Sequence, residues 1–328
     1  MSRPCSLLTI MLLAAMPLVP QAQADEAAGL REIEDLFSGA KVVRAPKSVD
    51  CKLTGGTVTR CFSITVKAEP STYQPGPWCP RKRSDGADVS GIWLDDGKVV
   101  DADGKFMANL GTFYNDRKWQ MVDPVTGEIK VTDTLEKCAA AARPDVTAEY
   151  ENHCVECLPQ YMLATATMTY TIPIEPQDRW RGRDIRRTGA GVALNGVRLD
   201  GPAPVDAILG AYTIAPFDDC GGHVNLHVGY HYHAVTDCLS KSAQPGEHAR
   251  IVGIAMDGYK IMAHTNADGS QPAGLDRCHG HKTAGLGYHY HAGAAGSNAI
   301  LGCLSAEAGC VSDDPDKACD ATARPPRP

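Results

Sequence analysis

The sequence lacks the signatures of several common enzyme and binding classes. Its 328 residues contain no Gly-x-Ser-x-Gly, Walker loop or dinucleotide-binding fingerprint. The segment "DADGK" at 101–105 lacks the acidic pattern of a calcium-binding loop. The formal net charge is −7 and no basic stripe is present, so we expect no nucleic-acid partner. No pattern indicates a groove for carbohydrate or peptide.

Long apolar runs are also scarce. The run from Leu7 to Val19 follows Arg3 and is too short to anchor the chain permanently in a bilayer. Together with the small residues Ala22 and Ala24, it predicts a secretory signal peptide over residues 1–24, cleaved after Ala24. We therefore expect an extracytoplasmic protein, periplasmic or secreted, without a membrane span.

Cysteine, in contrast, is plentiful. Of the 13 cysteines only Cys5 lies in the predicted signal peptide, and the remaining even number in an oxidising compartment predicts disulfides. Spacing and the repeat described below favour four pairs, with Cys220–Cys278 as a crossed alternative: Cys51–Cys61, Cys220–Cys238, Cys278–Cys303 and Cys310–Cys319. The "HCVEC" segment at 153–157 favours structural disulfides over a redox pair or a metal site, since Pro159 disfavours a helix at Cys154.

Residues 25–180 predict a β-rich region with short helices. An amphipathic helix is expected within 25–43, and a hairpin with a Gly-Gly turn within 51–66. "DTLEKCAAAARP" at 133–144 predicts a short helix that its proline ends. Alternating apolar and Thr residues over 161–174 predict a strand with one buried face.

The second half of the chain repeats itself, over about 190–240 and again over about 251–305. The repeated elements occur in the same order: "LNGVRL" and "MDGYKI", "CGGH" and "CHGH", "GYHYHA" twice, and "CLS" twice. We therefore predict a duplicated β unit over residues 181–312, packed about a pseudo-twofold axis, and a flexible tail over 313–328. The expected fold is mostly β, with a minor helical part, as a sheet or sandwich-like body that carries two His-Tyr-His strands.

These paired motifs resemble the YHYH-domain family of extracytoplasmic proteins. The resemblance covers roughly residues 60–305 and includes the upstream "TYTIP" strand and both hairpins. Where family members often read "DECNGH", this chain reads "DRCHGH", so that Arg277 replaces an acid and His279 adds an imidazole. The resemblance supports the boundaries and the site, and it implies no activity.

Histidines are concentrated in the two motifs, which hold eight of the eleven. Side chains two residues apart in a strand share one face, so each His-x-His pair can converge on one ion. A third imidazole from each Gly-rich turn completes a set that zinc or copper prefers. The predicted ligands are His223, His231 and His233 in the first repeat and His281, His289 and His291 in the second.

Three features of this site stay open in the sequence. Each repeat can hold its own ion, or the two strands can face each other and share one or two. The second ring nitrogen can be held by Asp219, Asp276 or a backbone carbonyl. His227 and His279 are unassigned extras, while His248 and His264 are expected at the surface.

Three functions are compatible with the sequence. The first is a metal-binding protein for sequestration, delivery or structure. The second is a metalloenzyme with an open position on a three-histidine ion, for which the proton-transfer group would be Asp219, Asp257, Asp276 or a motif Tyr. Asp257 is otherwise expected to serve a left-handed turn position. The third is an interaction module in which a buried His-Tyr network is purely structural.

Overall fold

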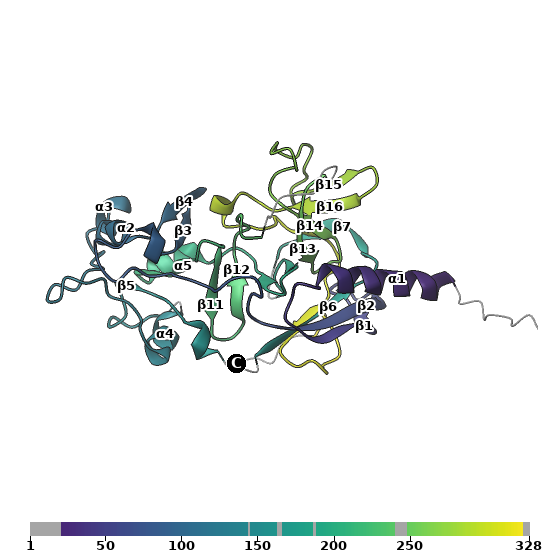
Figure 1. The fold of residues 1–328 in the computed structure, drawn as a ribbon, viewed down its shortest axis with the longest axis horizontal. Coiled ribbons are helices and arrows are strands. Elements are labelled where there is room, and N and C mark those ends of the chain that lie inside the picture. The colour runs from purple at the N-terminus through teal and green to yellow at the C-terminus, as the bar shows by residue number, and fades with distance from the viewer. Residues whose placement is uncertain (1–20, 144, 163–165, 186–187, 240–247, 324–328) are drawn as a thin grey trace, which may run out of the picture.

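A computed structural model describes residues 21–143, 145–162, 166–185, 188–239 and 248–323 (Figure 1). The protein is mostly β, as predicted, with several sheets and a few short helices. Apart from residues 21–24, the predicted signal peptide lies outside the described residues. Within the described ranges, no helix has the length and apolarity needed to cross a membrane.

The smaller of the two main sheets is antiparallel, with strand order β1-β2-β6-β18. Its strands are β1 (Val42–Lys52), β2 (Val58–Lys67), β6 (Thr167–Pro173) and β18 (Cys310–Ser312). Helix α1 (Gln21–Leu36) lies beside β1 (Figure 1). The expected hairpin is present, whereas the helix ends earlier than the sequence indicated, because the chain enters β1 at Val42.

Strand β6 differs from the expected one-sided strand. It lies between β2 and β18, and the threonines on its second face are also buried. There Thr169 hydrogen-bonds to Thr65, with 2.9 Å between the hydroxyl oxygens. Alternation therefore identified the strand, but β6 begins only at Thr167, since a 3-10 turn occupies Pro159–Tyr161. Satisfied threonine hydroxyls allow both of its faces to be covered.

The larger sheet has eight strands and contains the duplicated unit. Its order is β11-β12-β9-β8-β13-β14-β16-β15, which reads as the same four-strand pattern outward from the β8–β13 contact. The strands are β8 (Gly191–Ala193), β9 (Arg198–Leu199), β11 (Gly222–Asn225), β12 (Gly229–Tyr232), β13 (Ile251–Ala255), β14 (Lys260–Met262), β15 (Gly280–Thr283) and β16 (Gly287–His291). The pairing β12–β9 is parallel, as is its counterpart β14–β16.

The pseudo-twofold axis passes between β8 and β13. Val192 pairs with Ile254, flanked by Gly191 opposite Ala255 and Ala193 opposite Gly253. A Cβ at either glycine would collide with the main chain of the other strand. Glycine at the same place in both repeats therefore lets the two copies approach closely at their junction.

A second hydrophobic core lies beside the large sheet. Trp93, Phe106, Trp119 and Phe217 are buried in it. Its elements are β3 (Ile92–Asp95), β4 (Lys98–Asp101), α2 (Gly104–Ala108), α3 (Leu110–Phe113), β5 (His153–Cys154), α5 (Val205–Gly210) and β10 (Thr213–Ile214). Other short elements are α4 (Leu135–Ala141), β7 (Asp178–Arg183), β17 (Leu304–Ala306), η1 (Ala87–Val89), η2 (Pro159–Tyr161) and η3 (Ala295–Ser297).

Six disulfides link the chain. All four predicted pairs are present, and each repeat closes its own loop, so the crossed alternative is wrong. Cys154 bonds to Cys79 and Cys157 to Cys138. The Cys-x-x-Cys segment is therefore structural, because its two cysteines have different partners and neither is a free thiolate.

The described part of the C-terminal segment is not frayed, contrary to expectation. The Lys52 amide donates to the Cys319 carbonyl, and the Ala321 amide donates to the Lys52 carbonyl. The Cys310–Cys319 disulfide holds the segment in this position. Residues 313–323 therefore form a strap along β1.

Candidate metal centres

Each His-Tyr-His strand forms a hairpin with the strand that carries the Gly-rich turn. His223 in β11 lies directly opposite His231 in β12, and His281 in β15 lies opposite His289 in β16. The β11–β12 hairpin lies in the middle of the molecule, whereas β15–β16 lies at its edge (Figure 1). Because side chains alternate along a strand, the tyrosines of each motif face away from the histidines.

The tyrosines of each motif hydrogen-bond to two turns of their repeat, the Gly-rich turn and the Asx-Gly hairpin. In the first repeat Tyr230 donates to Asp218 at 2.7 Å, and the hydroxyl of Tyr232 accepts from Asn195 at 2.8 Å. The second repeat makes the equivalent bonds, Tyr288 to Asp276 at 2.8 Å and Tyr290 to Asp257 at 2.6 Å. The tyrosine face of the motif thus ties the His strand to its Gly-rich turn and to its Asx-Gly hairpin.

The two aspartates also cap the Gly-rich turns. Oδ1 of Asp218 accepts the Cys220 and Gly222 amides at 3.1 Å. Oδ1 of Asp276 accepts the equivalent amides of Cys278 and Gly280 at 2.8 and 2.9 Å. A Cβ on Gly222 would collide with the phenol of Tyr230, which explains why this turn position is glycine. The cap places the following histidine opposite the His strand.

On the other face of each strand, backbone carbonyls accept hydrogen bonds from the Nδ1 atoms of the imidazoles. Nδ1 of His231 donates to the Gly229 carbonyl at 3.0 Å, as Nδ1 of His289 does to Gly287 at 3.2 Å. The remaining anchored rings follow the repeat: His233 on Gly201, His291 on Ala263, His281 on Ala273, and His223 on the backbone of Ala215. Carbonyls only accept, so a donating Nδ1 carries the hydrogen and leaves Nε2 of a neutral ring with its lone pair.

These lone pairs converge in two groups. His223, His231 and His233 form the first-repeat cluster, in which the ligand atoms all lie within 4.8 Å of one another. The second-repeat cluster satisfies the same criterion and has four members: His248, His281, His289 and His291. The structure thus brings the six predicted residues together as two triads and adds a fourth imidazole to the second.

The second-repeat cluster has the dimensions of a zinc or copper site. Nε2 of His248 lies 3.3 Å from Nε2 of His281 and 3.0 Å from that of His291, and the His281–His289 distance is 3.0 Å. Metal–nitrogen bonds of about 2.0–2.1 Å in a tetrahedron separate the nitrogens by about 3.3 Å. The donor set fits a borderline cation and is unsuited to calcium or magnesium, which take oxygen ligands.

The two clusters are separate. Strands β12 and β16 lie five positions apart in the eight-stranded sheet, which at normal strand spacing is about 24 Å. The possibility that both His-x-His strands share one ion is therefore excluded by the sheet order.

Burial favours the neutral, metal-binding form of these rings. It lowers the pKa of His223 and His231 well below the ordinary value, and neighbouring imidazoles lower it further. Burial also lowers the pKa of His233 and His289, and lowers that of His291 to about 4. Protons therefore compete weakly for the ligand nitrogens near neutral pH.

His248 was expected at the surface; it is half-buried, and the sequence did not indicate that it belongs to the second-repeat cluster. It precedes β13, outside the duplicated motif, and by the alignment of the hairpins its sequence counterpart is Arg186. No repeat signal marks it, because the first copy has no histidine there. His227, His279 and His264 lie outside both clusters of the described residues.

Asp257 and Asp276, which were considered for ring binding or proton transfer, instead hold turns of the second repeat. The left-handed residue of the second hairpin is Gly258, not Asp257, whose buried carboxylate accepts from Tyr290 and the Ala306 amide. Asp276 caps its turn. Ring anchoring falls to carbonyls, which were the third option in the sequence analysis.

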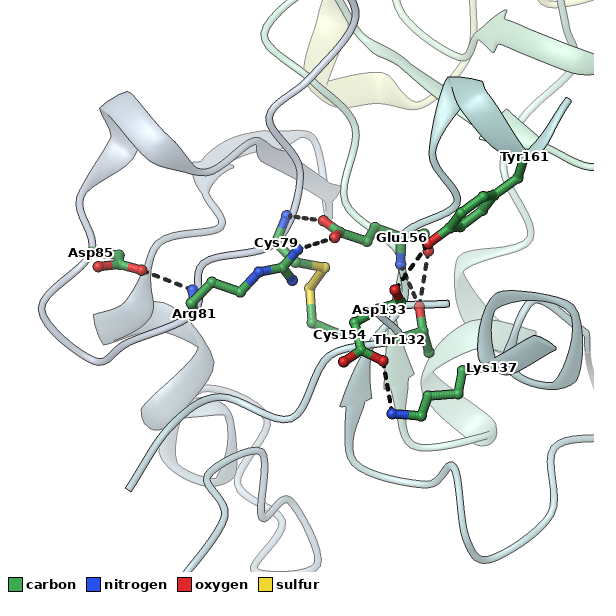
Figure 2. A network of polar contacts seen from close by, with 9 residues as sticks. All are labelled: Cys79, Arg81, Asp85, Thr132, Asp133, Lys137, Cys154, Glu156 and Tyr161. Carbon is green, nitrogen blue, oxygen red and sulfur yellow. Dashed lines mark hydrogen bonds and ion pairs between the residues drawn. A yellow bond between two sulfur atoms is a disulfide. The ribbon is translucent and has the colours of Figure 1, made fainter. Parts of the chain in front are cut away.

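A pocket of about 590 Å³ reaches the first-repeat cluster, and all three of its histidines line it. Glu156 lies in one wall, where its carboxylate accepts the Cys79 amide at 3.2 Å and pairs with Arg81 (Figure 2). Asp200 lies in another and pairs with Arg198 at 2.9 Å. No sequence pattern marks Asp200, because its counterpart in the second hairpin is the apolar Met262.

Comparison with known proteins supports the motif and adds no activity. The family model described as YHYH protein matches residues 169–273, from β6 to the segment after β14. No curated protein and no solved structure matches the chain significantly. The match identifies a YHYH domain over residues 169–273, which includes the first His-Tyr-His strand and is shorter than the resemblance expected over roughly residues 60–305.

Proposed function

We propose that this protein is an extracytoplasmic transition-metal-binding protein that holds zinc or copper, one ion in each repeat. The observation that carries the proposal is the convergence of imidazole nitrogens in both repeats. In the second-repeat cluster, neighbouring Nε2 atoms lie 3.0–3.3 Å apart.

The purely structural alternative explains this arrangement less well. With Nδ1 donating to a carbonyl, two neutral rings would bring lone pairs together at 3.0 Å between His281 and His289. A hydrogen bond there requires one ring to be doubly protonated, which burial disfavours for His289 by lowering its pKa. A bound cation satisfies all the converging lone pairs at once.

Six disulfides support the location, because structural disulfides persist in oxidising compartments. A periplasmic or secreted mature protein that begins at Asp25 is part of the proposal. Amino-terminal sequencing of the exported protein tests it, with Asp25 as the expected first residue.

A metal-dependent enzyme is the second candidate, favoured by the pocket that meets the first-repeat cluster. Three histidines leave a fourth position for a water that zinc ionises near neutral pH. Two carboxylates line this pocket, Asp200, which pairs with Arg198, and Glu156, which pairs with Arg81.

The decisive experiment is metal analysis of the mature protein purified from its native compartment. Mass spectrometry of the elements should find two equivalents of zinc or copper per chain. Chelation followed by reloading in a mixture of zinc, copper, calcium and magnesium should restore zinc or copper alone. Sub-stoichiometric zinc and copper in both experiments would contradict the proposal and favour the structural network.

A further inference from the structure

The first-repeat cluster has three imidazoles where the second has four, and it lies against a large pocket. Zinc and similar cations prefer four ligands. The second repeat can supply all four from its imidazoles, whereas the three rings of the first repeat leave one position open. The missing ligand must come from water or from a molecule in the pocket.

The pocket walls indicate what kind of molecule fits. Many of the lining side chains are aliphatic: Val155, Ile185, Ala207, Ile208, Val224 and Val228. At about 590 Å³ the space is within the range of small-molecule sites. An apolar body buried here gains from its removal from water.

The charged residues of the walls are already paired. Glu156 pairs with Arg81, Asp200 with Arg198 at 2.9 Å, and Arg143 with Asp145. Figure 2 shows that the Glu156 pair belongs to a wider polar network near the Cys79–Cys154 disulfide. These carboxylates and guanidinium groups are therefore committed to the protein itself.

The charge of the proposed site then favours an anion. Three neutral imidazoles around a divalent cation leave its two positive charges uncompensated in a buried position. Buried charge is costly unless it is paired, and a carboxylate donor would supply both the missing ligand and the missing charge.

We propose that the first-repeat site binds a small organic anion, a monocarboxylate with an apolar chain, whose carboxylate takes the open metal position while its chain fills the pocket. The inference rests on the proposed function, since the carboxylate is held by the bound ion. The second-repeat site, with four imidazoles, takes no such ligand.

Cobalt(II) substitution tests this inference, because its visible spectrum reports changes in coordination. The full-length mature protein is loaded with cobalt, its metal content is measured, and it is titrated with acetate and with hexanoate. His231→Ala removes a first-cluster ligand and His289→Ala removes a second-cluster ligand. Cobalt retained at the intact cluster and an unchanged circular dichroism spectrum show that each variant folds.

The expected result is a spectral change with hexanoate in the unmodified protein and in His289→Ala, and none in His231→Ala. Hexanoate should bind at least tenfold more tightly than acetate, since each buried methylene contributes roughly threefold to fourfold. Ile208→Trp, which fills the pocket, should remove that preference without loss of cobalt, whereas Val125→Trp on an exposed turn should not.

Two equivalents of cobalt with no response to either acid would overturn the inference and leave the proposed function standing. Equal affinity for acetate and hexanoate, or a response that survives His231→Ala but not His289→Ala, would also overturn it. Failure to bind cobalt, zinc or copper at all would overturn the proposed function and the inference together.

Discussion

The two repeats build the same hairpin, but they differ in what surrounds it. Both anchor their Gly-rich turns through an aspartate and a tyrosine, and both hold three imidazoles against backbone carbonyls. The first-repeat cluster then meets a pocket that Asp200 lines, while the second-repeat cluster gains His248. The two repeats share the same scaffold, and the fourth imidazole of the second cluster comes from outside the repeated motif.

This comparison explains the alternation of the motif. On one face of the strand its tyrosines bond to residues of two turns, and on the other face its histidines direct ring nitrogens toward a common cluster. A shift of register by one residue would exchange the two roles and destroy both.

The largest expected effect comes from removing one ligand of each triad. His231→Ala, which leaves two imidazoles, should lose one of two metal equivalents, whereas His289→Ala, which leaves three, should only weaken the second site. Neither should affect the other cluster, because the clusters lie far apart in the sheet. Elemental mass spectrometry after gel filtration measures both. Loss of both equivalents in either variant would contradict separate sites, provided that circular dichroism shows a folded chain.

Removing the disulfide of one repeat should destabilise the protein and loosen the adjacent cluster. Loops of 18 and 25 residues predict a loss of about 3 kcal/mol for either pair. Cys220→Ser with Cys238→Ser, and Cys278→Ser with Cys303→Ser, are compared in urea unfolding of the metal-free protein. Each should also weaken metal binding in its own repeat, and weakening only in the opposite repeat would contradict the account.

His248→Ala should convert the second-repeat site into a copy of the first. Affinity for zinc at that site should fall on the order of 100-fold, since water replaces an imidazole. The cobalt spectrum of the variant should then respond to small anions at this site. His264→Ala, outside both clusters, is the matched control, and an unchanged second-site affinity in His248→Ala would remove His248 from the ligand set.

Acid should destabilise the metal-free protein through its buried imidazoles. The pKa of His291 is lowered to about 4, below an unfolded value of about 6.5, so between these pH values the unfolded chain binds a proton that the folded one does not. Stability from this ring is present above pH 6.5 and is lost as the pH falls toward 4.

The difference in unfolding free energy between the unmodified protein and His291→Gln isolates this effect. It should shrink on the order of 1–2 kcal/mol from pH 7 to pH 4. His233→Gln should show the same direction in the first repeat, since burial lowers the pKa of His233 too. A difference that stays constant or grows on acidification would contradict the burial of these rings.

The smallest effect is expected from the turn caps. Asp218→Asn should cost about 1 kcal/mol of stability, because one acceptor of a buried turn is weakened. Asp276→Asn should cost less, since Asp276 is exposed. Thermal unfolding of the two variants side by side checks the order, and a reversed order would show that the caps contribute through something other than burial.

Much of this site could be predicted from sequence, because the positions of most of its histidines follow from short-range periodicity and from the repeat. The strand period of two places His231 and His233 together, and the repeat identifies His223 and His281 as equivalent. The two local disulfides of the repeats follow from the same duplication.

What escaped prediction depends on tertiary structure. His248 approaches its cluster from outside the repeat, and Asp200 reaches the pocket from the end of a two-residue strand. The disulfides Cys79–Cys154 and Cys138–Cys157 join segments whose proximity no local pattern encodes. The separation of the two clusters required the order of strands in the sheet, which follows from pairing between the repeats.

The most direct test of two independent imidazole sites is an anomalous diffraction map of the zinc- or copper-loaded protein, measured at the absorption edge of that metal. The account predicts two peaks per chain, one about 2.0–2.1 Å from Nε2 of the three first-cluster histidines and one at the same distance from the four of the second. A single peak between the repeats, or ions at neither cluster, would contradict it.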